Sequence, residues 1–327
     1  MTNATILGPE GHAVTNWEKS FFRDSDPLGF IVFARNVDSP DQLYRLTSDL
    51  RSAVGRDAPI LIDQEGGRVQ RMRAPHWREW VPPLEQAQKS HDPARSFWLR
   101  SRIMASELRA VGIDVNCAPT CDIASAETHP FLQNRCLGTD PDTVVQNARA
   151  TADGLLAGGV IPVMKHMPGH GRTVVDSHLN LPTADVARET AQAWDFAPFK
   201  ALADLPMGMT AHIIFSAFGS KPATQDSGMI DLIRTQIGFD GFLMSDDISM
   251  EALDGDLTRR TARSIAAGCD AVLHCNGKPK EMEEVVAAAG DLTQPAALRA
   301  DRALSLRDGA QNVDIAALNA ELDTLLA

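Results

Sequence analysis

The sequence predicts an α/β fold, a (β/α)8 TIM-like barrel with a helical C-terminal tail, and three observations lead to this prediction. Short apolar runs alternate with segments of helical periodicity from the first residues to about position 290. There are eight such runs, the number of parallel strands that closes a barrel. The G-x-G-x-x-G signature of an open dinucleotide-binding sheet does not follow the first run.

The alternation of apolar runs and helical segments is typical of βαβ units. We expect strands at 4–7, 29–34, 59–63, 114–118, 162–166, 208–213, 241–245 and 271–275. Helical periodicity, with Gly or Pro near most ends, predicts helices at 42–54, 93–111, 142–157, 189–203, 229–237 and 258–267. Ala and Leu at helical spacing predict that 294–327 forms the tail.

Residues 1–327 contain no low-complexity linker, so we expect a single catalytic barrel domain. The N-terminus has no basic region followed by an apolar stretch, which predicts a cytoplasmic protein. The five cysteines are then expected to be free thiols. A net charge of −12 argues against nucleic-acid and membrane partners. We expect a monomer with a small-molecule substrate and no cofactor.

Polar and ionisable side chains follow the predicted strands at their carboxyl ends, where the active sites of such barrels form. Asp63 ends the third strand, Lys165 and His166 the fifth, Asp246 the seventh, and His274 lies near the end of the eighth. A lone histidine at a strand end is usually a hydrogen-bonded core residue. Several ionisable groups on one rim instead indicate a polar ligand site.

The segment 165–178 contains a candidate acid/base pair. Asp176 can accept a hydrogen bond from one ring nitrogen of His178 and leave the other nitrogen free to transfer a proton. The alternative is a metal site that includes His166 and His170. Pro168 and Gly169 argue against the helix that would place those two histidines on one face, so we expect no metal.

Asp246 is the candidate nucleophile, because a carboxylate at the end of a strand is held rigidly. The alternative is a helix cap, since helix-forming residues follow it at 250–253. We assign capping to Asp247 or Ser249 and catalysis to Asp246, the residue nearest the strand.

Four segments together resemble the family 3 glycoside hydrolases, specifically the bacterial β-N-acetylhexosaminidases of the NagZ type. They are Ile62-Asp63-Gln64-Glu65-Gly66-Gly67-Arg68-Val69-Gln70-Arg71, Lys165-His166 through Gly171, Asp176-Ser177-His178 and Ser245-Asp246-Asp247-Ile248-Ser249-Met250. The resemblance implies a retaining enzyme that cleaves terminal GlcNAc from 1,6-anhydro-N-acetylmuramoyl fragments in peptidoglycan recycling. It implies that Asp246 is the nucleophile, that His178 is the acid/base oriented by Asp176, and that the sugar is held by Asp63, Arg71, Arg135, Lys165 and His166.

Other functions remain possible from the sequence. A neutral histidine acid/base repels phosphate less than a carboxylate does, so a phosphorylase on the same barrel is one alternative. Others are a β-glycosidase of different specificity, a metal-dependent hydrolase and a catalytically silent sugar-binding protein. The last is disfavoured because Asp176, His178 and Asp246 are all present.

Overall fold

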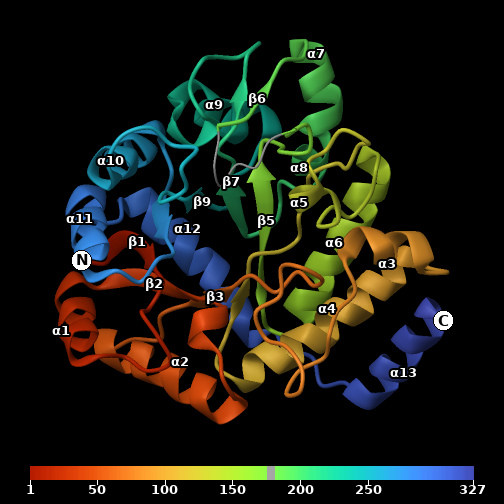
Figure 1. Ribbon diagram of the computed structural model, residues 1–327, viewed down its shortest axis with the longest axis horizontal. Coiled ribbons are helices and arrows are strands. Elements are labelled where there is room, and N and C mark those ends of the chain that lie inside the picture. Colours follow the sequence, from red (N-terminus) through yellow and green to blue (C-terminus); the bar gives the residue numbers. More distant parts are fainter. Residues whose placement is uncertain (175–180) are drawn as a thin grey trace.

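Eight parallel strands close into a barrel at the centre of the molecule (Figure 1). The computed structural model describes residues 1–174 and 181–327. In order around the barrel, the strands are β1 (Asn3–Leu7), β2 (Pro27–Val32), β3 (Ile60–Ile62), β4 (Val115–Asn116), β5 (Ile161–Met167), β7 (Met207–Thr210), β9 (Phe242–Asp247) and β10 (Ala271–His274), and β10 pairs with β1. The predicted fold class is confirmed, and each of the eight strands lies within three residues of its predicted bounds.

Helices surround the barrel, and local sequence explains where they begin. The principal ones are α1 (Asn16–Ser25), α2 (Pro40–Val54), α3 (Pro83–Lys89), α4 (Pro93–Ala110), α6 (Pro141–Ala157), α10 (Leu257–Ala267) and α11 (Pro279–Ala289). Asp92, Asp140 and Asp256 cap α4, α6 and α10 by accepting a hydrogen bond from a backbone N–H of the first turn. Proline occupies the first turn of α4 and α6, where its missing N–H costs nothing.

Two predicted helices are less regular than expected. The segment 189–203 is divided into α7 (Arg188–Thr190), a π-helical turn (Ala191–Asp195) and α8 (Ala197–Ala201). The segment 229–237 is divided into α9 (Ser227–Leu232) and a second π-helical turn (Ile233–Ile237). Hydrophobic periodicity shows that such segments are helical, but it does not reveal a one-residue change in the hydrogen-bond pattern.

A short pair of strands, β6 (Thr183–Ala184) and β8 (Ile214–Phe215), was also not predicted.

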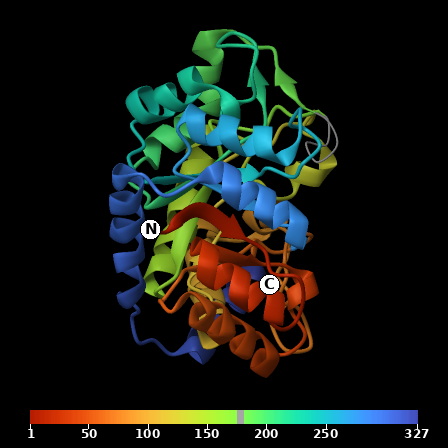
Figure 2. The same ribbon diagram turned by 90° about the vertical axis from the view of Figure 1, so that its left-hand side faces the viewer.

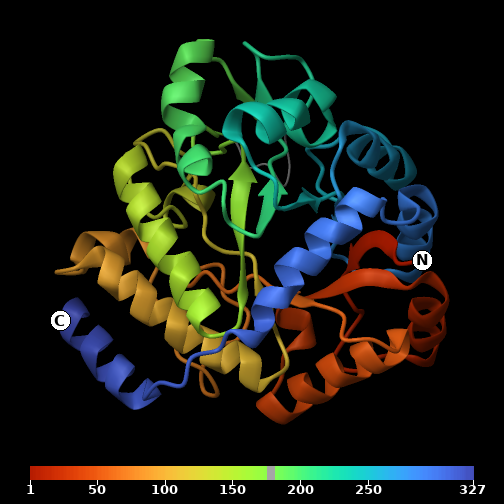
Figure 3. The same cartoon turned by 180° about the vertical axis from the view of Figure 1, so that it is seen from behind.

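The barrel interior is filled with apolar side chains that come from all parts of the chain. Ile6, Leu61, Val163 and Phe242 belong to this core, each with at most 1% of its surface exposed. Helix α12 (Gln294–Leu304) crosses the end of the barrel at which β1 begins, and it contributes small buried alanines (Figures 2 and 3). The strands terminate at the opposite end of the barrel, and the candidate site lies there.

The tail ends in α13 (Ile315–Leu326), which lies along α4 at the edge of the molecule (Figures 1 and 3). Leu322 is fully buried there, and Glu321 accepts hydrogen bonds of 2.7 and 2.8 Å from the Arg95 guanidinium. The helical tail is therefore present as predicted. Within residues 1–174 and 181–327, no helix combines the length and the apolar character that a membrane crossing requires.

Candidate active site

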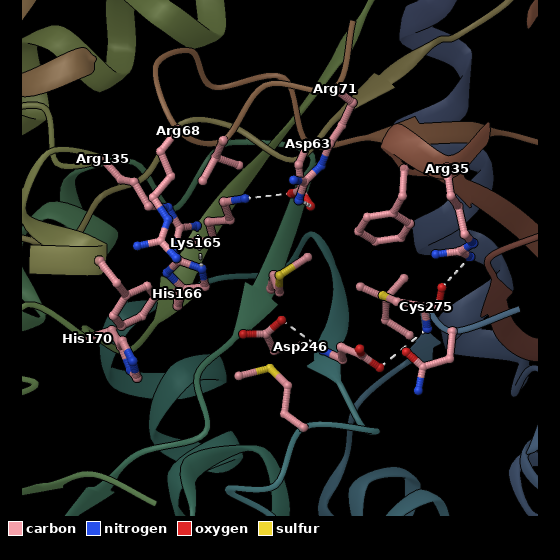
Figure 4. A pocket seen from close by; sticks show the side chains of 18 residues that line it. Arg35, Asp63, Arg68, Arg71, Arg135, Lys165, His166, His170, Asp246 and Cys275 are labelled. Atoms are coloured by element: carbon pink, nitrogen blue, oxygen red, sulfur yellow. Dashed lines mark hydrogen bonds and ion pairs between the residues drawn. The ribbon is translucent and has the colours of Figure 1, made fainter. Parts of the chain in front are cut away.

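A pocket of about 330 Å³ opens at the carboxyl ends of the strands (Figure 4). Six of the eight site residues expected from the sequence line it, namely Asp63, Arg71, Arg135, Lys165, His166 and Asp246. In barrels of this kind, alternate strands supply the side chains of one interior layer. Asp63 follows the third strand of the barrel, and Lys165 and Asp246 lie near the ends of the fifth and seventh, so the alternation places all three in one layer.

Lys165 lies at the centre of a buried ionic network. Its Nζ lies 2.8 Å from Asp63 Oδ1 and 2.6 Å from Glu65 Oε1, and only 2% of its side chain is exposed. Arg135 donates to both carboxylate oxygens of Glu65 at 2.8 and 2.9 Å, and Arg71 Nη2 lies 3.0 Å from Asp63 Oδ2. These contacts fix the polar groups that face the pocket before any ligand binds.

The network keeps its members charged despite their burial. Burial by itself would raise the pKa values of Asp63 and Glu65, but the Lys165 and arginine charges outweigh it. The pKa of Asp63 falls well below its usual range, and that of Glu65 falls to about 2. Burial would lower the pKa of Lys165, yet the two carboxylates raise it above its usual value. Both signs of charge are therefore present in the pocket at neutral pH.

His166 is oriented by a carboxylate that the sequence analysis did not single out. Its Nδ1 lies 2.6 Å from Asp122 Oδ2, and Asp122 Oδ1 accepts the backbone N–H of His170 at 2.7 Å. Because a carboxylate only accepts, the proton of this bond belongs to His166 Nδ1. The other nitrogen, Nε2, lies 3.4 Å from Arg135 Nη2. His166 is thereby held with Nε2 on the pocket side.

His170 also lines the pocket and was not predicted as a sugar-binding residue. Burial lowers its pKa to about 3, so it is neutral throughout the physiological range. The segment 166–170 leaves a strand and turns, as its proline and glycine indicated. Within the part of the chain that is described, no three His, Cys, Asp or Glu side chains are placed to hold a metal ion together.

Asp246 lies near the end of β9, and its carboxylate borders the pocket. Burial would raise its pKa, but His166, His212, the backbone N–H of Asp247 and Lys165 together lower it below the usual value. The Asp247 N–H donates to Asp246 Oδ1 at 2.8 Å. An ionised carboxylate on a rigid strand end can act as a nucleophile or stabilise a developing positive charge.

The expected capping role of the next residues needs correction. No helix begins at 250; α10 begins at Leu257 and is capped by Asp256. Asp247 instead accepts hydrogen bonds from the N–H and the hydroxyl of Ser249, at 3.0 and 2.7 Å, and holds a turn. Residues 250–253 have a high helix propensity but form no helix, because the chain turns at the end of the strand before α10 begins.

The remaining two predicted residues, Asp176 and His178, lie outside the described residues. Glu65 and Asp122, which hold side chains that line the pocket, were missed by sequence reasoning. Glu65 lies within the quoted motif, only two positions after Asp63. Asp122 carries no such signal, because its partner is 44 positions away in the sequence. The five cysteines are free, as predicted, and all five are buried.

The chain matches the model of the family described as "Glycosyl hydrolase family 3 N terminal domain" over residues 15–304. A curated relative named "Beta-hexosaminidase", from Alkalilimnicola ehrlichii, is 37% identical over 279 residues, which are 83% of this chain and 80% of the relative. A second protein of that name, from Tolumonas auensis, is 33% identical over 317 residues, 93% of this chain and 91% of the relative.

Solved structures agree with these sequence relatives. NagZ from Neisseria gonorrhoeae in complex with N-trifluoroacetyl-D-glucosamine superposes with a TM-score of 0.87 at 28% identity, covering 100% of this chain and 98% of that one. A glycoside hydrolase family 3 beta-N-acetylglucosaminidase from Paenibacillus sp. also gives 0.87, at 27% identity, covering 98% of this chain and 66% of that one. The family match, the relatives and the strand-end pocket lead to one conclusion: this chain belongs to the family 3 glycoside hydrolases.

Proposed function

We propose that this chain is a retaining β-N-acetylhexosaminidase that releases terminal, non-reducing GlcNAc from peptidoglycan fragments. The substrate would be GlcNAc joined to 1,6-anhydro-N-acetylmuramic acid, with or without a stem peptide, and the reaction would serve cell-wall recycling in the cytoplasm. The observation that carries the proposal is the ionised Asp246 carboxylate at the pocket, in the same barrel layer as the Asp63–Lys165 pair.

The reaction has two displacements. Asp246 attacks the anomeric carbon and forms a covalent glycosyl ester while the bond to the leaving oxygen breaks. His178, oriented by Asp176, donates its proton to that oxygen and becomes neutral. In the second step His178 takes a proton from water, the water oxygen attacks the same carbon, and the Asp246 carboxylate is released. Two inversions retain the β configuration.

The ionic network would bind the sugar in this scheme. Asp63 accepts hydrogen bonds from hydroxyl groups, and Lys165, Arg135 and Arg71 donate them. His166 would present Nε2 to the sugar while Asp122 holds the ring. Groups that are already fixed by ion pairs lose little freedom when a sugar binds, so they can stabilise the transition state.

The relatives support an N-acetylated sugar as the substrate. Curated relatives at 37% and 33% identity are named beta-hexosaminidase, and the similar NagZ structure holds an N-acylated glucosamine. The buried network also suits a terminal sugar, because Lys165 lines the pocket with a side chain that is only 2% exposed, and Glu65 holds it from behind with an equally buried carboxylate.

A first experiment compares nitrophenyl N-acetyl-β-glucosaminide with nitrophenyl β-glucoside. We expect the wild type to cleave only the acetamido sugar. Asp246→Ala should lower kcat by about ten-thousandfold or more, and His178→Ala by about a hundredfold or more. Asp256→Asn, which alters a helix cap outside the pocket, serves as the control and should keep wild-type activity. Failure of the wild type to cleave either glycoside would refute the proposal.

A second experiment addresses the natural substrate. GlcNAc-1,6-anhydro-N-acetylmuramic acid is incubated with the enzyme in phosphate buffer, and the products are separated by mass spectrometry. Hydrolysis yields free GlcNAc and the anhydro sugar. The appearance of GlcNAc 1-phosphate would instead identify a phosphorylase, and an intact disaccharide would overturn the assignment to peptidoglycan fragments.

A further inference from the structure

Four arginines line the pocket, and they differ in how their charges are balanced (Figure 4). Arg71 is paired with Asp63 and Arg135 with Glu65. Within the described residues, Arg35 and Arg68 form no ion pair with a carboxylate. A pocket cation that has neither a carboxylate partner nor another partner in the protein is available to bind an anionic ligand.

Arg35 already has hydrogen-bond partners in the protein. Its Nε and Nη2 donate to the carbonyl oxygen of Pro9 at 3.2 and 2.9 Å, and Nη2 also donates to that of Cys275 at 2.5 Å. These bonds join the segments that follow β1, β2 and β10. The hydrogen bonds by which Arg35 holds these segments together therefore account for its presence at the pocket.

Arg68 has no such role. Its side chain is exposed, and its guanidinium donates no hydrogen bond within the part of the chain that is described. The guanidinium carbon lies 5.7 Å from the centre of the Phe131 ring. This ring limits the orientations of the guanidinium but leaves all its N–H groups available for a ligand.

The backbone that carries Arg68 is a fixed turn. The N–H groups of Glu65 and Gly66 both donate to the carbonyl of Val69, at 2.8 and 2.9 Å. Gly66 and Gly67 have φ angles of +107° and +58°, and a side chain on Gly67 would place Cβ 2.8 Å from Pro82 Cα. Arg68 is thus presented from a turn that glycine and close packing hold in place.

The burial of the sugar-binding groups indicates which part of the substrate lies next to Arg68. The groups proposed to hold the terminal sugar are deep, with 2% of the Lys165 side chain and 11% of the Arg135 side chain exposed. A terminal sugar held there directs its leaving group toward solvent, where the exposed Arg68 lies. Resting on the proposed function, we propose that Arg68 is a specificity residue that binds a carboxylate on the leaving group of the substrate.

A carboxylate is a ligand that an arginine side chain binds well. A planar guanidinium can donate two parallel hydrogen bonds to one carboxylate, and this charge-assisted pair is stronger than a neutral hydrogen bond. Arg68 lies outside the ionic network proposed to hold the sugar, so its contact adds affinity only for substrates whose leaving group carries a carboxylate. The leaving group of the proposed substrate is an acid, because muramic acid carries a carboxylate on its lactyl ether.

The test uses two N-acetyl-β-glucosaminides, one with a neutral nitrophenyl leaving group and one with a carboxylated nitrophenyl leaving group. The ratio of their kcat/KM values is compared among variants, so the intrinsic reactivities of the leaving groups cancel. Arg68→Gln should lower kcat/KM for the carboxylated substrate about tenfold and change the neutral substrate less than about twofold. Arg68→Lys keeps the charge and should retain part of the preference.

Arg45→Gln is the matched control, because Arg45 is an exposed arginine on α2 and does not line the pocket. It removes the same charge and should leave the ratio unchanged. Added salt should weaken the wild-type preference but not that of Arg68→Gln. An equal fall for both substrates in Arg68→Gln, or no change in the ratio, would overturn the inference. If the wild type cleaves neither substrate, the proposed function itself has failed.

Discussion

The Nζ of Lys165 lies 2.6 Å from Glu65 Oε1, and both side chains are only 2% exposed. Glu65 also receives two hydrogen bonds from Arg135. One buried carboxylate therefore holds two of the cations assigned to sugar binding. Without Glu65, Arg135 would lose its carboxylate partner and Lys165 would keep only Asp63.

Glu65→Gln should therefore destabilise the protein and weaken sugar binding. Removal of one partner from a buried ion pair typically costs about 3 kcal/mol of the free energy of unfolding, because the remaining charge stays buried. Chemical denaturation measures this loss, and KM for the aryl glycoside should rise as well. The control is Glu85→Gln, which breaks an exposed pair with Lys89 and should cost less than about 0.5 kcal/mol. Equal effects of the two substitutions would contradict this account.

The stability of the wild type should fall in acid. Glu65 has a pKa of about 2 in the folded protein against an ordinary value of 4.5, and the pKa of Asp63 is also lowered. A depressed carboxyl pKa stabilises the folded state fully above the ordinary value, and the contribution disappears as pH falls toward the folded pKa. The free energy of unfolding, measured between pH 2 and about 6, should decrease below about pH 4.5. The decrease should be smaller for Glu65→Gln; identical slopes would assign the acid sensitivity to other groups.

Glu107 on α4 should have the opposite pH dependence. Burial raises the pKa of this carboxyl from 4.5 to about 6, although the Arg78 N–H donates a hydrogen bond of 3.3 Å to its Oε1. The ionised form is thus unfavourable in the folded protein, and its cost develops as pH rises from about 4.5 through 6. Glu107→Gln should stabilise the protein by about 1 kcal/mol at pH 7 and have no such benefit at pH 4. A destabilised variant at pH 7 would show that the charge is needed there.

Asp122→Asn should reduce activity without removing any residue that lines the pocket. The amide keeps the size of the carboxylate but offers only one acceptor oxygen, whereas Asp122 receives hydrogen bonds from both His166 Nδ1 and the His170 N–H. The orientation of His166 should become less defined, and kcat/KM should fall about tenfold or more. Steady-state kinetics on the aryl glycoside, with Asp256→Asn as the control, measure this effect. Wild-type kcat/KM in Asp122→Asn would exclude a positioning role.

The fold could be predicted because its signals are local. The alternation of apolar runs and helical segments located all eight barrel strands, and the parallel arrangement places their carboxyl ends on one rim. That geometry alone predicted that Asp63, Lys165, His166 and Asp246 would lie together. The π-helical turns escaped prediction because periodicity does not reveal a one-residue change in the hydrogen-bond pattern. The turn after Asp247 escaped it because helix propensity is only a weak guide where a side chain such as Asp247 holds a turn.

The sequence by itself determined the barrel, the helical tail and six of the polar residues that line the pocket. Only the tertiary structure decided how those groups are paired. Asp122 meets His166 across 44 positions and Lys165 meets Asp63 across 102. Periodicity indicates the face on which a side chain lies but not which distant side chain it contacts. The same limit applies to the arginines, since only spatial contacts show that Arg135 is paired with Glu65 while Arg68 has no carboxylate partner among residues 1–174 and 181–327.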